Sequence, residues 1–583
     1  MKSRTGDVWL KPQAIHQMNC RAEAKGSFRD RLLLVHFVKG TTTIVTFALV
    51  GIAHGQEYKL SIIHVNDFHA RFEEVNNASV TCDPSSDEIC LGGYARMVTV
   101  VKDLLAKRTN PLYLNAGDNF QGTLWYNLYG WNVTVEFLNM LPADAMTLGN
   151  HEFDHKLEGV LPFMDKILSP LLLVNVDNSE EPSFSKYEKS MIIERNGRKI
   201  GIIGVILRNM EEYTAAGSTG NLVFEDEVET VRLEAENLTN QGVNIIIVLS
   251  HCGIETDIEI AAHGGPNIDI IVGGHSHTFL YTGEHPHIPG TSRGTYPVVV
   301  DQPGGNHKVL IVQAAAYTKL VGDIVLSFDE RGIIQSWEGN PVYLSTDVVP
   351  DPEILEALIP WKEAIDVVGG QRVGFSSVDL LKSSCGYGEC NLGSLIADSM
   401  VEAFMPLAEP GHWTYASIAV IAIGGIRVSM LKGVLNFGML IEVIPFENLL
   451  TVVELRGDRL LGVLEYAVEK SQDDDWLSFS NMVQISGLHV EYNVTNPIGQ
   501  QVLSVEVLCS ECMVPKYEPL KALKYYRVVT NSFVAGGGDG FTIFSEFGVN
   551  KRNGPIDIEA FEKYVTERSP IMQGVDGRIK VYT

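Results

Sequence analysis

The chain has 583 residues, of which 45% are hydrophobic and 20% charged, a composition typical of folded globular proteins rather than disordered ones. Its 45 Lys and Arg residues are outnumbered by 72 Asp and Glu residues, which gives a formal net charge of −27. This balance argues against a nucleic acid as partner, and it suits an anionic small substrate only if a bound cation reverses the local field.

Residues 1–55 are predicted to be a secretory leader. They hold eight Lys or Arg and three acidic residues, followed by an uncharged, mostly apolar run at 41–53 that ends in Ala53-His54-Gly55. The alternative, a membrane-retained signal anchor, is disfavoured because the run is shorter than the roughly 20 residues of a spanning helix. No later segment reaches that length and the C-terminus shows no GPI signal, so we expect a secreted, extracellular protein without a stable membrane anchor.

Alternating apolar runs and helical patterns predict an α/β fold. The strand-like runs are apolar on both faces, as in buried sheets, and lie at 60–65, 111–114, 199–206, 244–250 and 268–274. Helical patterns between them include 93–107 and 227–241. We therefore predict a first α/β domain at 56–345, a helical connector at 346–368 interrupted by Pro360, and a second α/β domain at 369–583.

The cysteine positions favour an oxidising compartment. Six of the eight lie in close pairs, Cys82 with Cys90, Cys385 with Cys390 and Cys509 with Cys512, while Cys252 is left over. A zinc site at 509–512 is the alternative, but no second ligand pair lies at suitable spacing. Four N-x-S/T sequons, at Asn77, Asn132, Asn237 and Asn493, are compatible with secretion and glycosylation.

Polar side chains follow five strand-like segments of the first domain. They occur in Asn66-Asp67-Phe68-His69, Gly117-Asp118-Asn119, Gly149-Asn150-His151-Glu152-Phe153-Asp154, Ser250-His251 and Gly273-Gly274-His275-Ser276-His277. Each motif alone is compatible with an ordinary loop residue, turn or helix cap. Together they predict one site, because ligands bind at the carboxyl ends of the strands in an open α/β sheet.

The residue types in this cluster indicate divalent metals. Carboxylate, imidazole and amide ligands without thiolate suit Zn, Mn, Fe or Co rather than a closed structural zinc site. We expect zinc, with Mn, Co, Mg or Ca as alternatives. Seven ligands exceed the needs of one catalytic ion and suit two, roughly 3.5–4 Å apart and bridged by a carboxylate. Two such ions would also supply the positive field that an acidic protein needs to bind phosphate.

In this order and spacing, the motifs resemble those of the metallophosphoesterases, and residues 56–583 resemble the 5′-nucleotidase/apyrase family. The resemblance implies a four-layer α/β/β/α metallophosphoesterase domain followed by a C-terminal α/β nucleotide-binding domain. It assigns Asp67, His69 and His277 to one metal and Asn150, His251 and His275 to the other, with Asp118 bridging. It further assigns His151 and Asp154 to a catalytic dyad and Arg71 to the phosphate side of the site.

The same resemblance implies a nucleotide pocket in the second domain. Phe446 and Phe533 would stack on the base, Asp539 would hold the ribose, and Gly424, Gly425 and Arg427 would form part of a substrate loop. Taken without the resemblance, both phenylalanines would be interpreted as core residues and the glycine run 536–538 as a turn. The chain departs from the family at Gly386 and Ala422, where an arginine and an asparagine are usual. These losses favour ADP and ATP over AMP as substrates.

The expected function is a secreted, metal-dependent hydrolase of extracellular nucleotides. It would act as an apyrase on ATP and ADP, as a 5′-nucleotidase on AMP, or as both, and the resemblance implies an anti-platelet role in a salivary setting. Alternatives are a nucleotide-sugar or cyclic-nucleotide phosphodiesterase, and a catalytically weak protein that binds or scavenges nucleotides. The sequence does not indicate the oligomeric state.

Overall fold

The computed structural model describes residues 57–76, 78–82, 89–215, 217–283, 292–303, 307–469 and 478–583. The predicted leader at 1–55 and the sequon residue Asn77 lie outside these residues.

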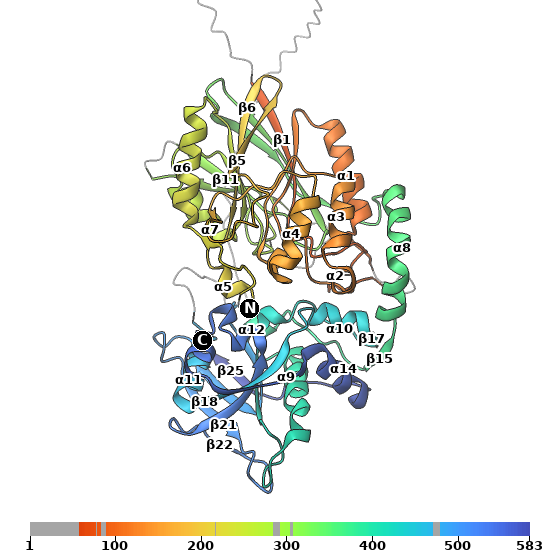
Figure 1. The fold of residues 1–583 in the computed structure, drawn as a ribbon, viewed down its shortest axis with the longest axis vertical. Coiled ribbons are helices and arrows are strands. Elements are labelled where there is room, and N and C mark those ends of the chain that lie inside the picture. Colours follow the sequence, from red (N-terminus) through yellow and green to blue (C-terminus); the bar gives the residue numbers. More distant parts are fainter. Residues whose placement is uncertain are drawn as a thin grey trace, which may run out of the picture. The chain divides into compact units, whose positions relative to one another are not determined.

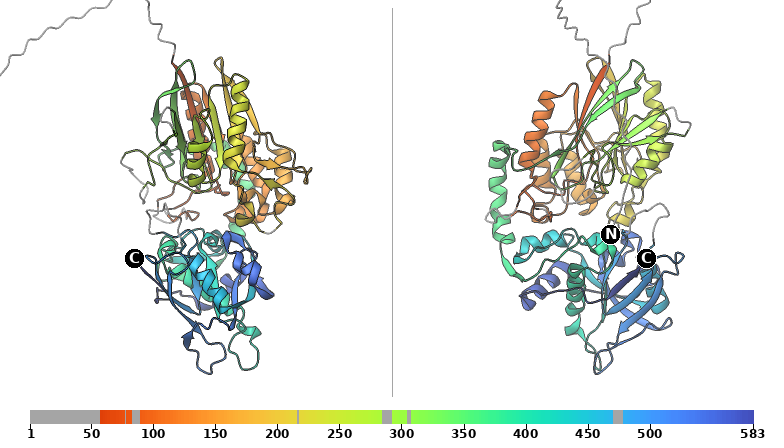
Figure 2. Two further views of the ribbon diagram at one scale, coloured as in Figure 1. Left: turned by 90° about the vertical axis from the view of Figure 1, so that its left-hand side faces the viewer. Right: turned by 180° about the vertical axis from the view of Figure 1, so that it is seen from behind.

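Two six-stranded sheets form the centre of the N-terminal region (Figures 1 and 2). The first has the order β13-β12-β1-β2-β3, with β14 paired to β12. Its strands are β1 (Tyr58–Val65), β2 (Pro111–Asn115), β3 (Ala145–Met146), β12 (Leu320–Phe328), β13 (Ile334–Gly339) and β14 (Val342–Tyr343). The second has the order β10-β11-β9-β8-β6-β5. Its strands are β5 (Ser190–Arg195), β6 (Arg198–Ile206), β8 (Ile246–His251), β9 (Ile270–Val272), β10 (Val298–Asp301) and β11 (Lys308–Val312). A separate pair joins β4 (Val176–Asp177) to β7 (Val223–Phe224).

The strands that carry the site motifs run parallel to their neighbours. In the first sheet β1 pairs with β2 and β2 with β3, and in the second β6 pairs with β8 and β8 with β9, all in parallel. Their carboxyl ends therefore lie at the same edge of each sheet, where the loops can meet.

Alternating side chains explain why the two sheets stack. Leu60 and Ile62 of β1 belong to a buried cluster that also contains Ile200 and Ile202 of β6, whereas Ile63 packs into a different cluster with helix residues such as Val98. Because both faces of the strands are covered, the sequence reads as continuous apolar runs. The predicted four-layer α/β/β/α arrangement is confirmed.

Helices cover the outer faces of the sheets. Figure 1 shows α1 and α3 on one side and α6 and α7 on the other. The helices of this region are α1 (Tyr94–Lys107), α2 (Leu124–Tyr129), α3 (Trp131–Met140), α4 (Lys156–Lys166), α5 (Met210–Tyr213), α6 (Glu227–Asn240) and α7 (Ile254–His263). The predicted helices at 93–107 and 227–241 thus correspond to α1 and α6.

The connector is a single helix, α8 (Pro352–Gly369), capped by the Asp351 carboxylate, which accepts hydrogen bonds from two first-turn N–H groups. The expected interruption at Pro360 is wrong, since α8 continues through it. A proline removes one backbone donor, but the buried face of α8, which includes Ile354, Leu358 and Ile365, keeps the helix in place.

The C-terminal region contains two larger sheets, with the orders β19-β16-β23-β18-β24 and β22-β21-β20-β25. Their strands are β16 (Ile418–Ala422), β18 (Leu449–Arg456), β19 (Val483–Ser486), β20 (Leu488–Asn493), β21 (Val502–Leu508), β22 (Tyr517–Pro519), β23 (Tyr525–Asn531), β24 (Val549–Ile556) and β25 (Ile579–Tyr582). A smaller pair joins β15 (Arg372–Ser376) to β17 (Gly433–Asn436). The helices are α9 (Asn391–Ala403), α10 (Phe437–Val443), α11 (Gly457–Tyr466), α12 (Ser532–Ala535), α13 (Thr542–Phe547) and α14 (Asp557–Arg568).

The three predicted cysteine pairs are disulfides: Cys82–Cys90, Cys385–Cys390 and Cys509–Cys512. The remaining described cysteine, Cys252, is buried and free. Within the described ranges, no helix has both the length and the apolar character needed to cross a membrane.

Candidate metal centre and substrate pocket

The predicted metal ligands come from loops at the carboxyl ends of strands in both sheets. In the first sheet, Asp67 and His69 follow β1, Asp118 follows β2 and Asn150 follows β3. In the second sheet, His251 is the last residue of β8, and His275 and His277 follow β9. The two sheets therefore contribute to one centre.

Backbone strain is concentrated in these loops. Asp67, His69, Asp118, His275 and His277 all have positive φ, between 51° and 70°, a region that non-glycine residues seldom adopt. Gly149 is required for a different reason, because a Cβ there would lie 2.1 Å from Asp118 Oδ1. Such clustered strain is a mark of functional sites, where the surrounding structure compensates for it.

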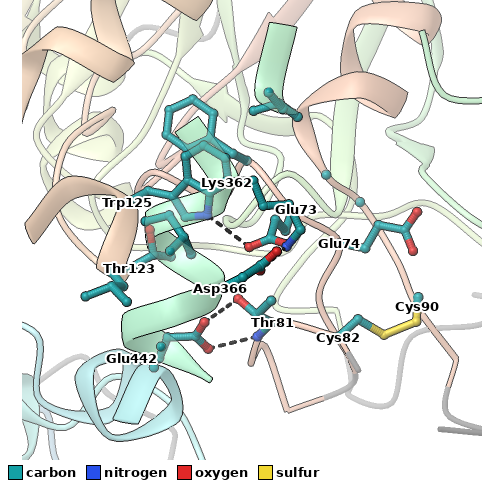
Figure 3. Close-up of a pocket in the computed structure, with 18 of the residues that line it drawn as sticks. Glu73, Glu74, Thr81, Cys82, Cys90, Thr123, Trp125, Lys362, Asp366 and Glu442 are labelled. Atoms are coloured by element: carbon teal, nitrogen blue, oxygen red, sulfur yellow. Dashed lines mark hydrogen bonds and ion pairs between the residues drawn. A yellow bond between two sulfur atoms is a disulfide. The ribbon is translucent and has the colours of Figure 1, made fainter. Parts of the chain in front are cut away.

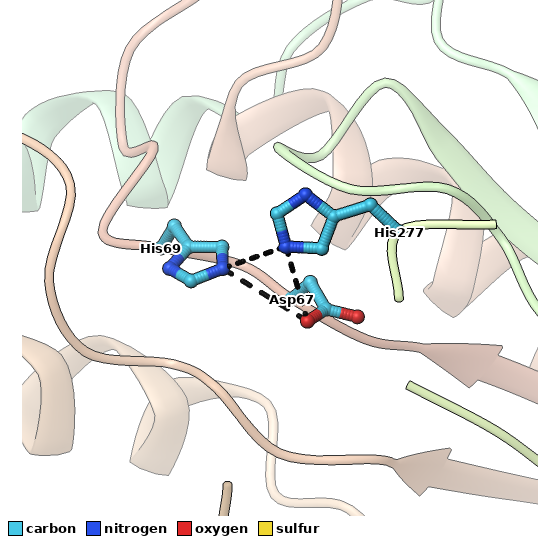
Figure 4. A group of neighbouring side chains, drawn as sticks. All are labelled: Asp67, His69 and His277. Atoms are coloured by element: carbon cyan, nitrogen blue, oxygen red, sulfur yellow. Dashed lines mark hydrogen bonds and ion pairs between the residues drawn. The ribbon is translucent and has the colours of Figure 1, made fainter. Parts of the chain in front are cut away.

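Asp67, His69 and His277 form the first ligand group (Figure 4). The Nε2 atoms of His69 and His277 lie 3.0 Å apart, and His277 Nε2 lies 3.3 Å from Asp67 Oδ1. Because His69 Nδ1 faces the carbonyl oxygens of Phe120 and Gln121 at 3.2 Å, it carries the proton, and the Nε2 lone pair is directed into the group.

Asp118, His251 and His275 form the second ligand group. His251 Nδ1 donates to the Ala116 carbonyl at 2.7 Å, which leaves Nε2 facing Asp118 Oδ2 at 3.2 Å. His275 Nδ1 lies 2.9 Å from the Asn150 side-chain oxygen, which places this amide beside the group. The structure thus brings all seven predicted ligands together.

The donors fit divalent cations. Asp67 and Asp118 are buried carboxylates, and burial lowers the pKa of His69 and His277 and lowers that of His275 to about 3, so these rings are neutral, as ligands must be. Burial opposes protonation of His251 as well, but the Asp118 carboxylate outweighs it and raises the pKa to about 10, which shows that this position attracts positive charge. The imidazole lone pairs converge on this position, and the two buried carboxylates carry negative charge, so a bound cation would stabilise the cluster.

His151 and Asp154 form a hydrogen-bonded pair next to this centre. His151 Nδ1 lies 2.8 Å from Asp154 Oδ2, and Nε2 lies 4.0 Å from Asp118 Oδ2. Burial disfavours the imidazolium, but Asp154 and Asp118 outweigh it, so the pKa of His151 is raised. His69, Asp118 and His151 also lie within ligand distance of one another, so only metal analysis distinguishes a dyad role for His151 from a ligand role.

A cavity of about 680 Å³ joins the metal centre to the C-terminal region. Its lining includes six substrate residues expected from the sequence: Gly424, Gly425, Arg427, Phe446, Phe533 and Asp539. The ring of Phe446 stacks on His151 with centroids 5.6 Å apart, and the Arg427 guanidinium lies 5.7 Å from the centre of the Phe446 ring. Burial raises the pKa of Asp539 to about 6, partly offset by Arg427, so this carboxylate is mostly ionised at pH 7.

Comparison with known proteins agrees with this geometry. Residues 60–279 match the family described as calcineurin-like phosphoesterase, and residues 372–546 match the 5′-nucleotidase C-terminal domain. An apyrase of Tabanus yao is 44% identical over 90% of this chain and 94% of its own length. A 5′-nucleotidase of Bos taurus is 34% identical over 90% of this chain and 91% of its own. The crystal structure of a 5′-nucleotidase precursor from Thermus thermophilus matches with a TM-score of 0.80 and 34% identity, over 90% of this chain and 99% of that one.

The chain belongs to the 5′-nucleotidase/apyrase family.

Arg71 is the one expected substrate residue that does not line this cavity. Its side chain is 1% exposed and is absent from the lining of the cavity, and Nη1 lies 3.1 Å from Glu442 Oε2. Glu442 also accepts hydrogen bonds from the backbone and hydroxyl of Thr81 (Figure 3). The structure therefore places Arg71 in a buried ion pair between the N- and C-terminal regions, and its role on the phosphate side stays a prediction.

Gly386 and Ala422, the two positions at which the resemblance implies a departure from the family pattern, are also buried and lie outside the cavity lining. A Cβ at Gly386 would lie 2.7 Å from Ser478 Oγ, and Ala422 belongs to an apolar cluster of the C-terminal region. Restoring an arginine and an asparagine at these positions would therefore require local repacking as well as new contacts.

From the sequence alone, no role was assigned to Glu152, which stabilises the loops that carry Asp118 and Asn150. Its buried carboxylate accepts hydrogen bonds from the backbone N–H groups of Gly149 (2.6 Å), Asn119 (2.6 Å) and Asp118 (3.1 Å). It thereby ties the loop after β2 to the loop after β3. The sequence could have indicated this role, because Glu152 follows directly after the candidate site residues Asn150 and His151.

Proposed function

We propose that this protein is a secreted hydrolase of extracellular nucleotides that removes terminal phosphate groups from ATP and ADP, from AMP, or from all three. The observation that carries the proposal is the shared cavity, because one wall holds two carboxylate–imidazole groups suited to divalent metals and the other holds Phe446, Phe533 and Asp539. The relatives named apyrase and 5′-nucleotidase support the same assignment.

Asp67, His69 and His277 are proposed to hold one divalent ion and Asn150, His251 and His275 the other, with Asp118 shared. Two such ions would supply Lewis-acid polarisation of the phosphoryl group. We propose zinc, because each ion would have two imidazole nitrogens among oxygen ligands, a mixed set that suits a metal between hard and soft. Manganese or cobalt could substitute for it.

His151 and Asp154 are proposed to act on the leaving oxygen. Asp154 accepts from Nδ1, which fixes the ring and leaves Nε2 facing the centre. Because the pKa of His151 is raised, the imidazolium is available near neutral pH to stabilise developing charge or donate a proton.

The C-terminal residues are proposed to bind the nucleoside. Phe446 and Phe533 offer rings for the base, and Asp539 offers an ionised acceptor for the ribose hydroxyls. Gly424 permits this arrangement, since a Cβ there would lie 2.7 Å from Asp539 Oδ2.

The decisive experiment is phosphate release from AMP, ADP, ATP and UDP-glucose by the purified protein, with and without a chelator. Chelator-sensitive release from the adenine nucleotides is expected. Release only from UDP-glucose would favour a nucleotide-sugar phosphodiesterase, and binding without release would favour a scavenger.

Secretion from a leader ending near Gln56 is part of the same proposal and rests on the basic, apolar and small-residue pattern of 1–55. In a salivary setting, removal of ATP and ADP would oppose platelet aggregation. N-terminal sequencing of protein recovered from culture medium tests the cleavage site, and protein found only in membranes with residues 32–53 attached would contradict it.

A further inference from the structure

A second cation lines the substrate cavity beside Arg427. Lys382 belongs to the lining together with Arg427, Phe446 and Asp539, although its sequence context, Asp379-Leu380-Leu381-Lys382-Ser383-Ser384, contains no recognised motif. Burial, followed by the charge of Arg427, lowers the pKa of Lys382 to about 8, so the two cations are close enough to repel each other.

The backbone holds Lys382 in this position. Its N–H donates to Ser429 Oγ at 2.9 Å, and its carbonyl accepts from the Cys385 N–H at 2.9 Å. The preceding N–H, of Leu381, donates to Asn391 Oδ1 at 3.0 Å, and the Cys385–Cys390 disulfide closes the following loop. The backbone at Lys382 is therefore held in place, and the side chain projects from a fixed point of the wall.

In the part of the chain that the structure describes, no ion pair joins Lys382 or Arg427 to a carboxylate, and the one hydrogen bond of the Arg427 guanidinium goes to the Gly424 carbonyl at 3.5 Å. The charge of Arg427 does reach Asp539, where it opposes the effect of burial on the pKa of that carboxyl. Two adjacent unpaired cations in a half-buried cavity are costly, since each repels the other. An anionic ligand between them would remove that cost.

The position of Arg427 relates this pair to the metal centre. Its guanidinium lies 5.7 Å from the centre of the Phe446 ring, that ring stacks on His151, and His151 Nε2 lies 4.0 Å from Asp118 Oδ2 of the second ligand group. Arg427 thus lies in the same cavity as Lys382 and close to the metal centre, where a terminal phosphate would bind. An anion bound between Lys382 and Arg427 would belong to the same ligand as that phosphate.

We propose that Lys382 is a specificity-determining residue that, with Arg427, binds the penultimate phosphate of a nucleoside di- or triphosphate. This inference rests on the proposed function and deepens it. When the terminal phosphate of ADP lies at the metal centre, its inner phosphate faces this cation pair. AMP has no second phosphate, so Lys382 contributes little to its binding.

The charge supplied by Lys382 also bears on the missing arginine at position 386. Gly386 lies in the loop closed by Cys385 and Cys390 and has no cationic side chain, whereas Lys382 enters the cavity from just before that loop.

Steady-state kinetics with AMP and ADP test the assignment. Lys382→Gln should lower kcat/KM for ADP by about tenfold to a hundredfold, the loss typical of one charge-assisted hydrogen bond, while kcat/KM for AMP stays within about twofold of native. Lys382→Arg should restore most of the ADP efficiency. Lys432→Gln removes an exposed lysine of the same region outside the cavity lining and is expected to leave both substrates unaffected.

Binding of α,β-methylene-ADP and of adenosine, measured by calorimetry, separates this inference from the proposed function. Lys382→Gln should weaken the former about tenfold or more and leave the latter unchanged, whether or not the protein turns over nucleotides. Equal losses for ADP and AMP, equal losses for both ligands, or no loss at all would overturn the role of Lys382. Absence of phosphate release by the native protein would instead contradict the proposed function.

Discussion

The buried pair of Arg71 and Glu442 gives a prediction that separates a structural role from a role in phosphate binding. Glu442→Gln keeps an acceptor for Thr81 but removes the negative charge facing the guanidinium. The side chains of Arg71 and Glu442 are 1% and 5% exposed, so Arg71 would remain as a charge without a counter-ion in a site nearly closed to solvent. Loss of one partner from a buried pair costs about 3–5 kcal/mol, and we expect the free energy of unfolding to fall by that amount.

Double-mutant analysis refines this expectation. In Arg71→Met/Glu442→Gln both charges are gone, and we expect the free energy of unfolding to recover to within about 2 kcal/mol of native. Arg71→Met alone leaves the Glu442 carboxyl, whose pKa is already raised by burial against the lowering effect of Arg71. Without Arg71 that pKa rises further, so this variant should be less destabilised at pH 5 than at pH 8.

Urea unfolding followed by intrinsic fluorescence, together with phosphate release by the folded variants, provides the measurements. A phosphate-binding Arg71 would give the opposite result, a large loss of kcat/KM in Arg71→Met with little change in stability. The reasoning is refuted if Glu442→Gln stays within about 1 kcal/mol of native, or if the double variant loses the sum of the two single losses.

Three further predictions concern the cavity. Asp118→Asn should release bound metal and abolish phosphate release, and native-like rates in metal-free buffer would contradict a metal mechanism. His151→Ala should keep its metal, measured by elemental analysis, yet lose roughly 10²–10⁴-fold in kcat, and parallel loss of metal would make His151 a ligand. Because burial, together with the charge of Arg427, lowers the pKa of Lys382 to about 8, its ammonium is present below that pH and lost above it. KM for ADP should therefore rise as pH passes through 8, where Asp539 is already ionised, and Lys382→Arg should remove that rise.

The sequence predicted the local structure of the N-terminal region well, because buried parallel strands carry a strong signal. The runs at 60–65, 111–114 and 199–206 correspond to β1, β2 and β6. Periodicity alone did not show that β1 and β6 belong to different sheets, since strands covered on both faces look alike in sequence. The division of these strands between two sheets was expected only from the resemblance to the metallophosphoesterases.

Side-chain direction was the main limit on predicting the site. Motifs that follow five strand-like segments predicted that these polar residues cluster, and the family resemblance assigned the individual residues as candidate metal ligands. The position of Arg71 could not be predicted in this way, because a residue two positions beyond His69 can point toward the centre or away from it, and only the fold shows that it faces Glu442. Lys382 gave no motif signal, and its role depends on a cavity that tertiary packing creates.

The origin of the ligands in two separate sheets makes the metal ions cross-links of the fold. The group of Asp67, His69 and His277 and the group of Asp118, His251 and His275 each combine residues that follow β1 or β2 with residues at the end of β8 or after β9, so neither of these two groups is complete before the sheets have docked. Ions that bind only the docked state add RT ln(1 + [M]/Kd) to its stability, a thermodynamic linkage that makes the melting temperature depend on free metal concentration. A chain that folds without bound metal would thus be a folded but less stable protein, and metal supply would affect its resistance to proteases as well as its activity.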